Sequence, residues 1–255
     1  MKKDDNKKKW MSLSYKQRRV RLENIYKLLR KTAQKQLNLL DDFKNSKEEM
    51  KTERHSYFFS IVNSFWDDGD FALALGKNKF KHYAIYPTRT MMEKLLKILW
   101  FSNQKSEDQD MITKKELLRS CLLSHMRDKN NGYKNSLFEK HYKGLNDVNL
   151  PEISKVKISE LNSFPKYEEL SKKSGLIDAD TFYDSYRSLS EMPHGNLLSI
   201  FMLQNGYKDQ FYMQAMHNIV RFCIEMIKVV DFHLDHAMRQ EIKDLIKLSE
   251  EISFK

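Results

Sequence analysis

Apolar residues recur every three or four positions along most of this chain. That spacing places them on one face of a helix and is typical of amphipathic helices packed on a core. The first such run predicts a long helix from about Tyr15 to Phe43, with its apolar residues at Leu22, Tyr26, Leu29, Ala33, Leu37, Leu40 and Phe43.

The same periodicity predicts further helices over about Glu48–Phe65, Pro87–Phe101, Met111–Arg127, Asp180–Ser190, Gln210–His236 and Ala237–Ser249. The Pro87 helix should be the most buried, since apolar residues surround most of its circumference. Two Gly and two adjacent Asp in WDDGDFALALGKNKF predict a loop with a short helical turn. Residues 133 to 174 should form short helices and loops.

Composition supports long helices in a globular protein. The 255 residues are 40% hydrophobic and include only 7 Gly and 4 Pro, and no useful length of strand-like alternation occurs. We expect an all-α fold: a flexible basic arm over residues 1–12, then one multi-helix, bundle-like domain over 13–255. No apolar leader, no membrane-spanning run and two cysteines in apolar patterns favour a cytoplasmic protein without membrane contact.

Positive charge is concentrated at the start of the chain. Residues 1 to 31 carry twelve Lys or Arg and three acids, which accounts for nearly all of the net charge of +10. A concentrated basic stripe suits phosphate backbones, and a solvated tail that aids solubility is the alternative. The candidate nucleic-acid contacts are Lys7, Lys8, Lys9, Arg18, Arg19 and Arg21.

Metal and nucleotide sites have weak support in the sequence. One Glu-x-x-His pair, Glu191 and His194, has Pro193 inside it, and no second pair exists. Asp231, His233, Asp235 and His236 near one helix end could supply two ligands but imply no complete set. Phosphate-binding glycine loops are absent. We therefore expect no metal and no cofactor.

The segment YRSLSEMPHGN, residues 186 to 196, combines an Arg, a His and a helix-breaking Pro. Pro193 denies a backbone hydrogen bond, so a helix break is expected between Ser190 and Gly195. Arg187 and His194 would then flank the break and converge on one cleft. Such a pair suits metal-independent RNA cleavage, with His moving the proton and Arg binding phosphate oxygens. Alternatively, Arg187 pairs with Glu93 in the core and His194 caps a helix.

YRSLSEMPHGN also resembles the R-x(4–6)-H signature of the HEPN superfamily, all-α proteins of toxin–antitoxin and phage-defence systems. Together with YPTRTMMEKLL, about a hundred residues earlier, it resembles an uncharacterised bacterial helical family with an Arg-x3-Glu helix and a Tyr-x-x-Leu-Ser-x3-His element. The resemblance implies that Arg187 and His194 are catalytic and that two protomers join their motifs in a homodimer. The supporting residues that it or the segment suggests are Tyr183, Tyr186, Ser190, Glu191, Asn196, Arg89 and Glu93, the last two as a buried pair.

Asn196 stands where HEPN toxins controlled by nucleotidyltransferase antitoxins usually have Tyr, so that mode of control is not expected. Two functions follow from the sequence. The first is a HEPN-like endoribonuclease acting on RNA, with a possible antitoxin or defence-system partner protein. The second is a non-catalytic helical module that binds RNA or a protein and dimerises.

Overall fold

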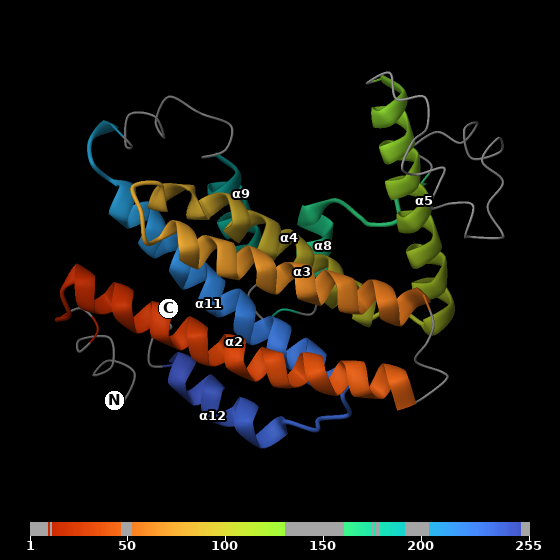
Figure 1. Ribbon diagram of the computed structural model, residues 1–255, viewed down its shortest axis with the longest axis horizontal. Helices are drawn as coiled ribbons and strands as arrows, with labels where there is room; N and C mark the ends of the chain where they lie inside the picture. Colours follow the sequence, from red (N-terminus) through yellow and green to blue (C-terminus); the bar gives the residue numbers. More distant parts are fainter. Residues whose placement is uncertain are drawn as a thin grey trace.

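The protein is all-α, as the hydrophobic periodicity predicts. The computed structural model describes residues 10, 12–46, 53–130, 161–174, 176, 179–191 and 204–250, and these contain no strand. Its elements are α2 (Tyr15–Ser46), α3 (Glu53–Leu75), the 3-10 helix η2 (Lys81–Ala84), α4 (Ile85–Ser102), α5 (Ser106–Asn130), α8 (Tyr167–Lys173), α9 (Ala179–Glu191), α11 (Lys208–His233) and α12 (Arg239–Glu250) (Figure 1).

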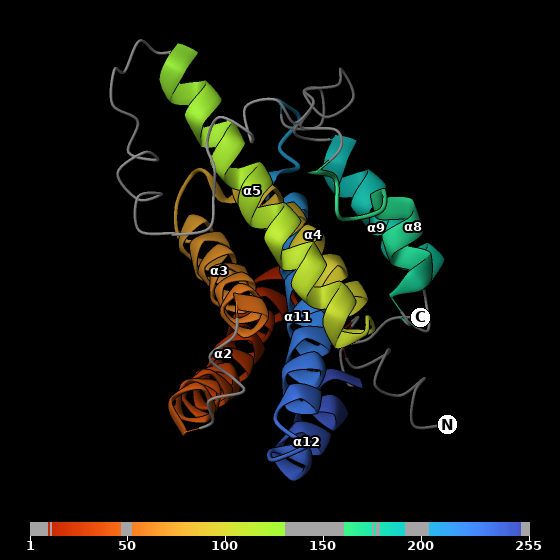
Figure 2. The ribbon, with the colours of Figure 1, turned by 90° about the vertical axis from the view of Figure 1, so that its right-hand side faces the viewer.

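Helix α11 occupies the centre of the packed helices. It contacts α2, α4, η2, α3 and α12, and fifteen of its 26 residues are buried. The expectation that the Pro87 helix is the most buried is wrong, because only nine of the 18 residues of α4 are buried. The difference is small, because α4 is itself packed among α3, α8, α9, η2 and α11 (Figure 2), and only Tyr86 and Thr90 of its residues are exposed.

Helix α3 continues through the first part of the segment predicted as a loop, residues 66–75, so the prediction is wrong there, while residues 76–80 form the turns that precede η2. Gly69 lies inside α3 against the ring of Tyr26, where an added Cβ would stand 2.6 Å from the phenolic oxygen. The Tyr26 hydroxyl donates to Asp70 Oδ1 at 2.7 Å, and Arg30 Nε lies 3.0 Å from Asp70 Oδ2. Gly69 and Asp70 therefore serve the contact between α2 and α3 and do not end the helix, which ends one residue before Gly76.

A buried polar contact joins the two longest neighbours of the core, α2 and α11. Gln36 is 1% exposed, and its Nε2 donates to the backbone oxygen of Ile227 at 2.9 Å. One turn of helix away on α2, apolar side chains such as Ala33 and Leu40 are buried. The amide therefore stands among apolar residues with its hydrogen bond made, as burial of a polar group requires.

Trp10 falls within the predicted arm, yet it is 2% exposed and belongs to the core. Its ring meets His217 of α11 edge-on, with centroids 5.5 Å apart, and Arg21 lies 5.9 Å from its centroid. Of the other arm residues, 1–9 and 11 lie outside the described residues, and Ser12 is exposed. Within the described part of the chain, every helix is too short or too polar to cross a bilayer.

Candidate functional site

Of the two residues predicted as catalytic, the structure describes Arg187 but not His194. Arg187 lies in the next-to-last turn of α9 with an exposed side chain. His194 and Asn196 lie outside the described residues, as does Pro193, so the predicted helix break and cleft are untested. Glu191 is the last residue of α9, and its side chain is also outside the description.

Helix α9 is positioned by its apolar face. Phe182 and Leu189, seven residues apart, are 2% and 1% exposed, and Phe182 packs on Phe222 of α11 with ring centroids 5.6 Å apart. Seven residues are about two helical turns, so both side chains lie on one face. Arg187 falls on the opposite side of the helix and points to solvent.

A group of side chains that we call the Arg89 cluster holds α4, α8 and α9 together. It consists of Arg89, Glu93, Tyr167, Tyr183 and Tyr186. Arg89 Nε donates to Glu93 Oε1 at 3.0 Å, and its Nη2 donates to the Tyr186 hydroxyl at 3.4 Å. The guanidinium also lies 5.5 Å from the centroid of the Tyr186 ring.

The remaining tyrosines extend this cluster on both sides of Tyr186. The ring centroid of Tyr167 of α8 lies 4.9 Å from that of Tyr186, and Tyr183 stacks on Tyr186 with ring centroids 6.3 Å apart. Burial, and then the charge of Glu93, raise the pKa of Tyr167, so its hydroxyl stays protonated and donates to Glu93. The cluster thus fixes the helix that carries Arg187.

Several expectations can be compared with this arrangement. The alternative in which Arg187 pairs with Glu93 in the core is wrong, because the Arg187 side chain is exposed and Glu93 pairs with Arg89 of its own helix. The side chains of Arg89 and Glu93 are 25% and 22% exposed, so the pair is half-buried and not fully buried. Burial opposes the charge of Arg89, but the hydrogen bond and charge of Glu93 outweigh it and raise the pKa of the guanidinium.

Ser190 makes a local contact only. Its hydroxyl donates to the backbone oxygen of Tyr186 at 2.7 Å, one turn back along α9. Such back-bonding occupies a carbonyl near the helix end and is common for serine in helices. Ser190 therefore belongs to the frame of α9 in this structure.

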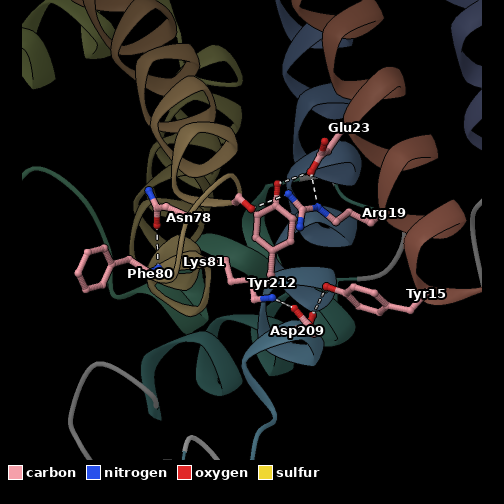
Figure 3. A network of polar contacts seen from close by, with 9 residues as sticks. Tyr15, Arg19, Glu23, Asn78, Phe80, Lys81, Asp209 and Tyr212 are labelled. Atoms are coloured by element: carbon pink, nitrogen blue, oxygen red, sulfur yellow. Dashed lines mark hydrogen bonds and ion pairs between the residues drawn. The ribbon is translucent and has the colours of Figure 1, made fainter.

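Arg19, predicted as a nucleic-acid contact, is committed to the fold instead. In what we call the Arg19 cluster, its Nε donates to Glu23 Oε1 at 2.8 Å and its Nη2 donates to the Gly76 oxygen at 2.5 Å (Figure 3). Its guanidinium lies 5.0 Å from the centroid of Tyr212, whose hydroxyl donates to Glu23 at 3.0 Å. A guanidinium with these partners has little capacity left for a phosphate.

Further polar contacts extend the Arg19 cluster to η2. The Tyr15 hydroxyl donates to the backbone oxygen of Asp209 at 2.9 Å, and Lys81 forms an ion pair with the Asp209 carboxylate (Figure 3). Burial, and then the charge of Glu23, raise the pKa of Tyr212, which keeps this hydroxyl a donor. The cluster therefore ties the start of α2 to η2 and to the start of α11.

The other basic candidates differ from Arg19. Lys7, Lys8 and Lys9 lie outside the described residues. Arg21 lines an open apolar groove of about 460 Å³ along α2, whose other lining residues are Lys16, Gln17, Val20, Asn24, Ile25 and Leu28. Arg18 is half-buried, and its Nε makes no hydrogen bond with the residues that the structure describes. This face of α2 is as much apolar as basic.

The acidic and histidine side chains near the end of α11 make contacts in different places. Asp231 accepts a hydrogen bond from the Met238 backbone N–H at 2.9 Å and meets His236 at 3.3 Å, while Asp235 and His236 adopt positive φ angles of 52° and 63°. His233 points elsewhere, with its Nε2 3.0 Å from the Ser102 hydroxyl. Among the described residues no three ligand-type side chains come together. These residues build the turn into α12.

Two features escaped the sequence analysis. Tyr167 carried no signal, because α8 is a short helix in a region of weak periodicity. The Arg19 cluster could have been suspected from the Arg-x3-Glu spacing of Arg19 and Glu23, which equals that of Arg89 and Glu93. Comparison with known proteins adds nothing further, since no family model, curated protein or solved structure matches the chain.

Proposed function

We propose that the protein is a metal-independent endoribonuclease of the HEPN type, which acts on RNA in a toxin or phage-defence system. The observation that carries the proposal is the state of Arg187. Its side chain is exposed on α9, makes no ion pair with the described residues, and stands next to Tyr186, which the Arg89 cluster fixes. An arginine that the fold does not use, on a helix that the fold holds firmly, suits transition-state binding.

The chemistry follows from the residue types. His194 takes the proton of a ribose 2′-hydroxyl, the 2′-oxygen forms a bond to the adjacent phosphorus, and the bond from phosphorus to the 5′-oxygen breaks. The proton is delivered to the departing 5′-oxygen, which leaves 2′,3′-cyclic phosphate and 5′-hydroxyl ends. Arg187 binds two phosphate oxygens and stabilises the charge of the transition state. A homodimer would bring two such motifs together.

The test is cleavage of purified total RNA in EDTA, with the ends of the products analysed. His194→Ala should abolish cleavage, and Arg187→Ala should lower the rate by a factor on the order of 10² to 10³. Arg239→Ala removes another exposed arginine, on α12, and should leave the rate unchanged. Circular dichroism confirms that each variant is folded.

Two results would contradict the proposal. One is a His194→Ala protein that cuts at the wild-type rate. The other is a His194→Ala or Arg187→Ala protein that unfolds, since the segment would then be structural.

One observation favours the second candidate, a non-catalytic helical module that binds RNA. The segment from Gly76 to Met92 contains four Lys or Arg and no acid, and its start and the first turn of α4 carry exposed aromatic rings. If the protein binds RNA through these basic and aromatic side chains and no preparation of it cleaves RNA, the non-catalytic module is supported and the endoribonuclease is rejected.

A further inference from the structure

Three aromatic side chains stand exposed in a row where η2 runs into α4. Phe80, Tyr83 and Tyr86 are 46%, 44% and 44% exposed, so nearly half of the surface of each residue is open to solvent. Neighbouring ring centroids are 6.1 Å apart for Phe80 and Tyr83 and 5.8 Å apart for Tyr83 and Tyr86. They form a continuous surface that the core does not use.

Basic side chains flank these rings. Lys79 Nζ lies 5.2 Å from the centroid of Phe80, and Lys77 is also exposed. Burial, and then the charge of Lys208, lower the pKa of His82, whose ring lies 4.1 Å from Tyr83. Lys208 is exposed at the first position of α11, and α11 packs against η2. We call the three rings with Lys77, Lys79 and Lys208 the basic aromatic strip.

The strip is held in a fixed shape by contacts beneath it. The Phe80 backbone N–H donates to Asn78 Oδ1 at 2.7 Å, and the Tyr83 N–H donates to the Phe80 oxygen at 2.8 Å. Lys81 turns inward to Asp209, whereas the Phe80 ring points away from the Arg19 cluster (Figure 3). A preformed surface loses little conformational freedom on binding.

We propose that the basic aromatic strip is a binding site for single-stranded RNA. Bases stack on Phe80, Tyr83 and Tyr86, and phosphates meet the ammonium groups beside them. Surfaces of this kind, aromatic rings with adjacent cations, bind single strands with little sequence preference. A membrane surface fits less well as the partner of the strip. Residues 76–90 contain no exposed aliphatic side chain beside the rings.

The strip also leads toward the helix that carries Arg187. Arg89 follows Tyr86 by three residues on α4, and it contacts Tyr186 of α9. A strand stacked on the rings would thus continue toward the candidate catalytic segment. This directional part rests on the proposed function, whereas RNA binding by the strip does not.

Binding can be measured without cleavage by using the full chain with His194→Ala. Fluorescence anisotropy of a labelled RNA of about 12 nucleotides gives Kd, and each of Phe80→Ala, Tyr83→Ala and Tyr86→Ala should weaken binding about tenfold. Phe71→Ala removes a ring that is 58% exposed on α3 and serves as the matched control, with Kd unchanged. Lys79→Ala should reduce the salt dependence of log Kd by about 0.7.

Stacking itself can be read from 2-aminopurine placed in the same RNA. Its fluorescence should be quenched on binding, and Tyr83→Ala should restore it. The inference is overturned if the ring variants keep Kd within about twofold, if blunt duplex RNA binds as well as the single strand, or if anionic vesicles bind through the rings and RNA does not. Ring-dependent binding by a protein that never cuts RNA would support the strip and reject the endoribonuclease.

Discussion

The Arg19 cluster and the Arg89 cluster are built from the same parts. In each, an arginine donates its Nε to a glutamate four residues later, at 2.8 Å for Glu23 and 3.0 Å for Glu93. In each, the guanidinium also faces a tyrosine ring from another helix, at 5.0 Å for Tyr212 and 5.5 Å for Tyr186. The spacing of arginine and glutamate alone therefore does not distinguish a functional pair from a structural one.

The two clusters differ in what surrounds them. The Arg19 cluster is closed by the Gly76 carbonyl and by Tyr212, which is 0% exposed. The Arg89 cluster lies at the outer side of α4, where its tyrosines belong to the short helix α8 and to α9 beside the exposed Arg187. We infer that the first cluster serves stability and that the second also serves the orientation of α9.

The largest expected effect is on the Arg19 cluster, through Gly76→Ala. An added Cβ would stand 2.0 Å from the Tyr212 hydroxyl oxygen, so the buried ring must shift. We expect the free energy of unfolding, measured with urea, to fall by about 3 kcal/mol. Gly206→Ala is the control: its φ of 87° is strained for alanine but the space is open, so a loss of about 1 kcal/mol is expected. Equal losses at the two positions would contradict the close packing at Gly76.

Acid should loosen the side of the molecule that holds the Arg19 cluster. Burial, and then the charge of Arg18, lower the pKa of His217 to about 4 in the folded protein, against about 6.5 when unfolded. The unfolded chain therefore binds more protons between these values, and stability falls as pH falls from about 6.5 to 4, by on the order of 2 kcal/mol. Since His217 packs on Trp10 beside α2, hydrogen exchange in α2 and α11 should speed up.

A substitution separates this histidine from the other buried one. Burial, and then the charge of His55, also lower the pKa of His233 to about 4, at the opposite end of α11. His217→Gln should remove the contribution of His217 to the pH dependence of the unfolding free energy. The double variant with His233→Gln should remove the contributions of both histidines. A pH profile that His217→Gln leaves unchanged would exclude its role.

The smallest effects come from single hydroxyl groups. Tyr212→Phe removes a 3.0 Å bond to Glu23 and should cost about 1 kcal/mol of unfolding free energy. Tyr186→Phe removes a 3.4 Å bond from Arg89 and should cost about 0.5 kcal/mol. If Tyr186→Phe proves the more costly in urea unfolding, the Arg89 cluster is a main source of stability and our distinction fails.

The sequence predicted the helices well where apolar residues recur on one face. The helix predicted over Tyr15–Phe43 is α2, and those predicted over Asp180–Ser190 and Gln210–His236 are α9 and α11 within a few residues. The loop prediction at Gly69 is wrong because the glycine makes room for the ring of Tyr26, a residue 43 positions earlier in the chain. The sequence alone does not distinguish a glycine that makes room for a neighbouring ring from a glycine that ends a helix.

Side-chain roles were less predictable for the same reason. The pairing of Arg89 with Glu93 follows from helical spacing and is confirmed. Arg19 counted toward a basic stripe in the sequence, yet its cluster includes Tyr212, a residue 193 positions later. Charge density along a chain does not reveal which charges the fold will pair.

The bond from Gln36 to the Ile227 carbonyl has a consequence for how α2 finds its place on α11. Long helices with regular apolar faces can slide past each other by one turn, about 5.4 Å, and bury nearly the same surface. After such a slip the Gln36 amide would face apolar side chains with its bond lost, at a cost of about 1–3 kcal/mol. Gln36→Leu should therefore leave a folded protein in which α2 samples more than one alignment, seen as doubled resonances for the residues that face α11.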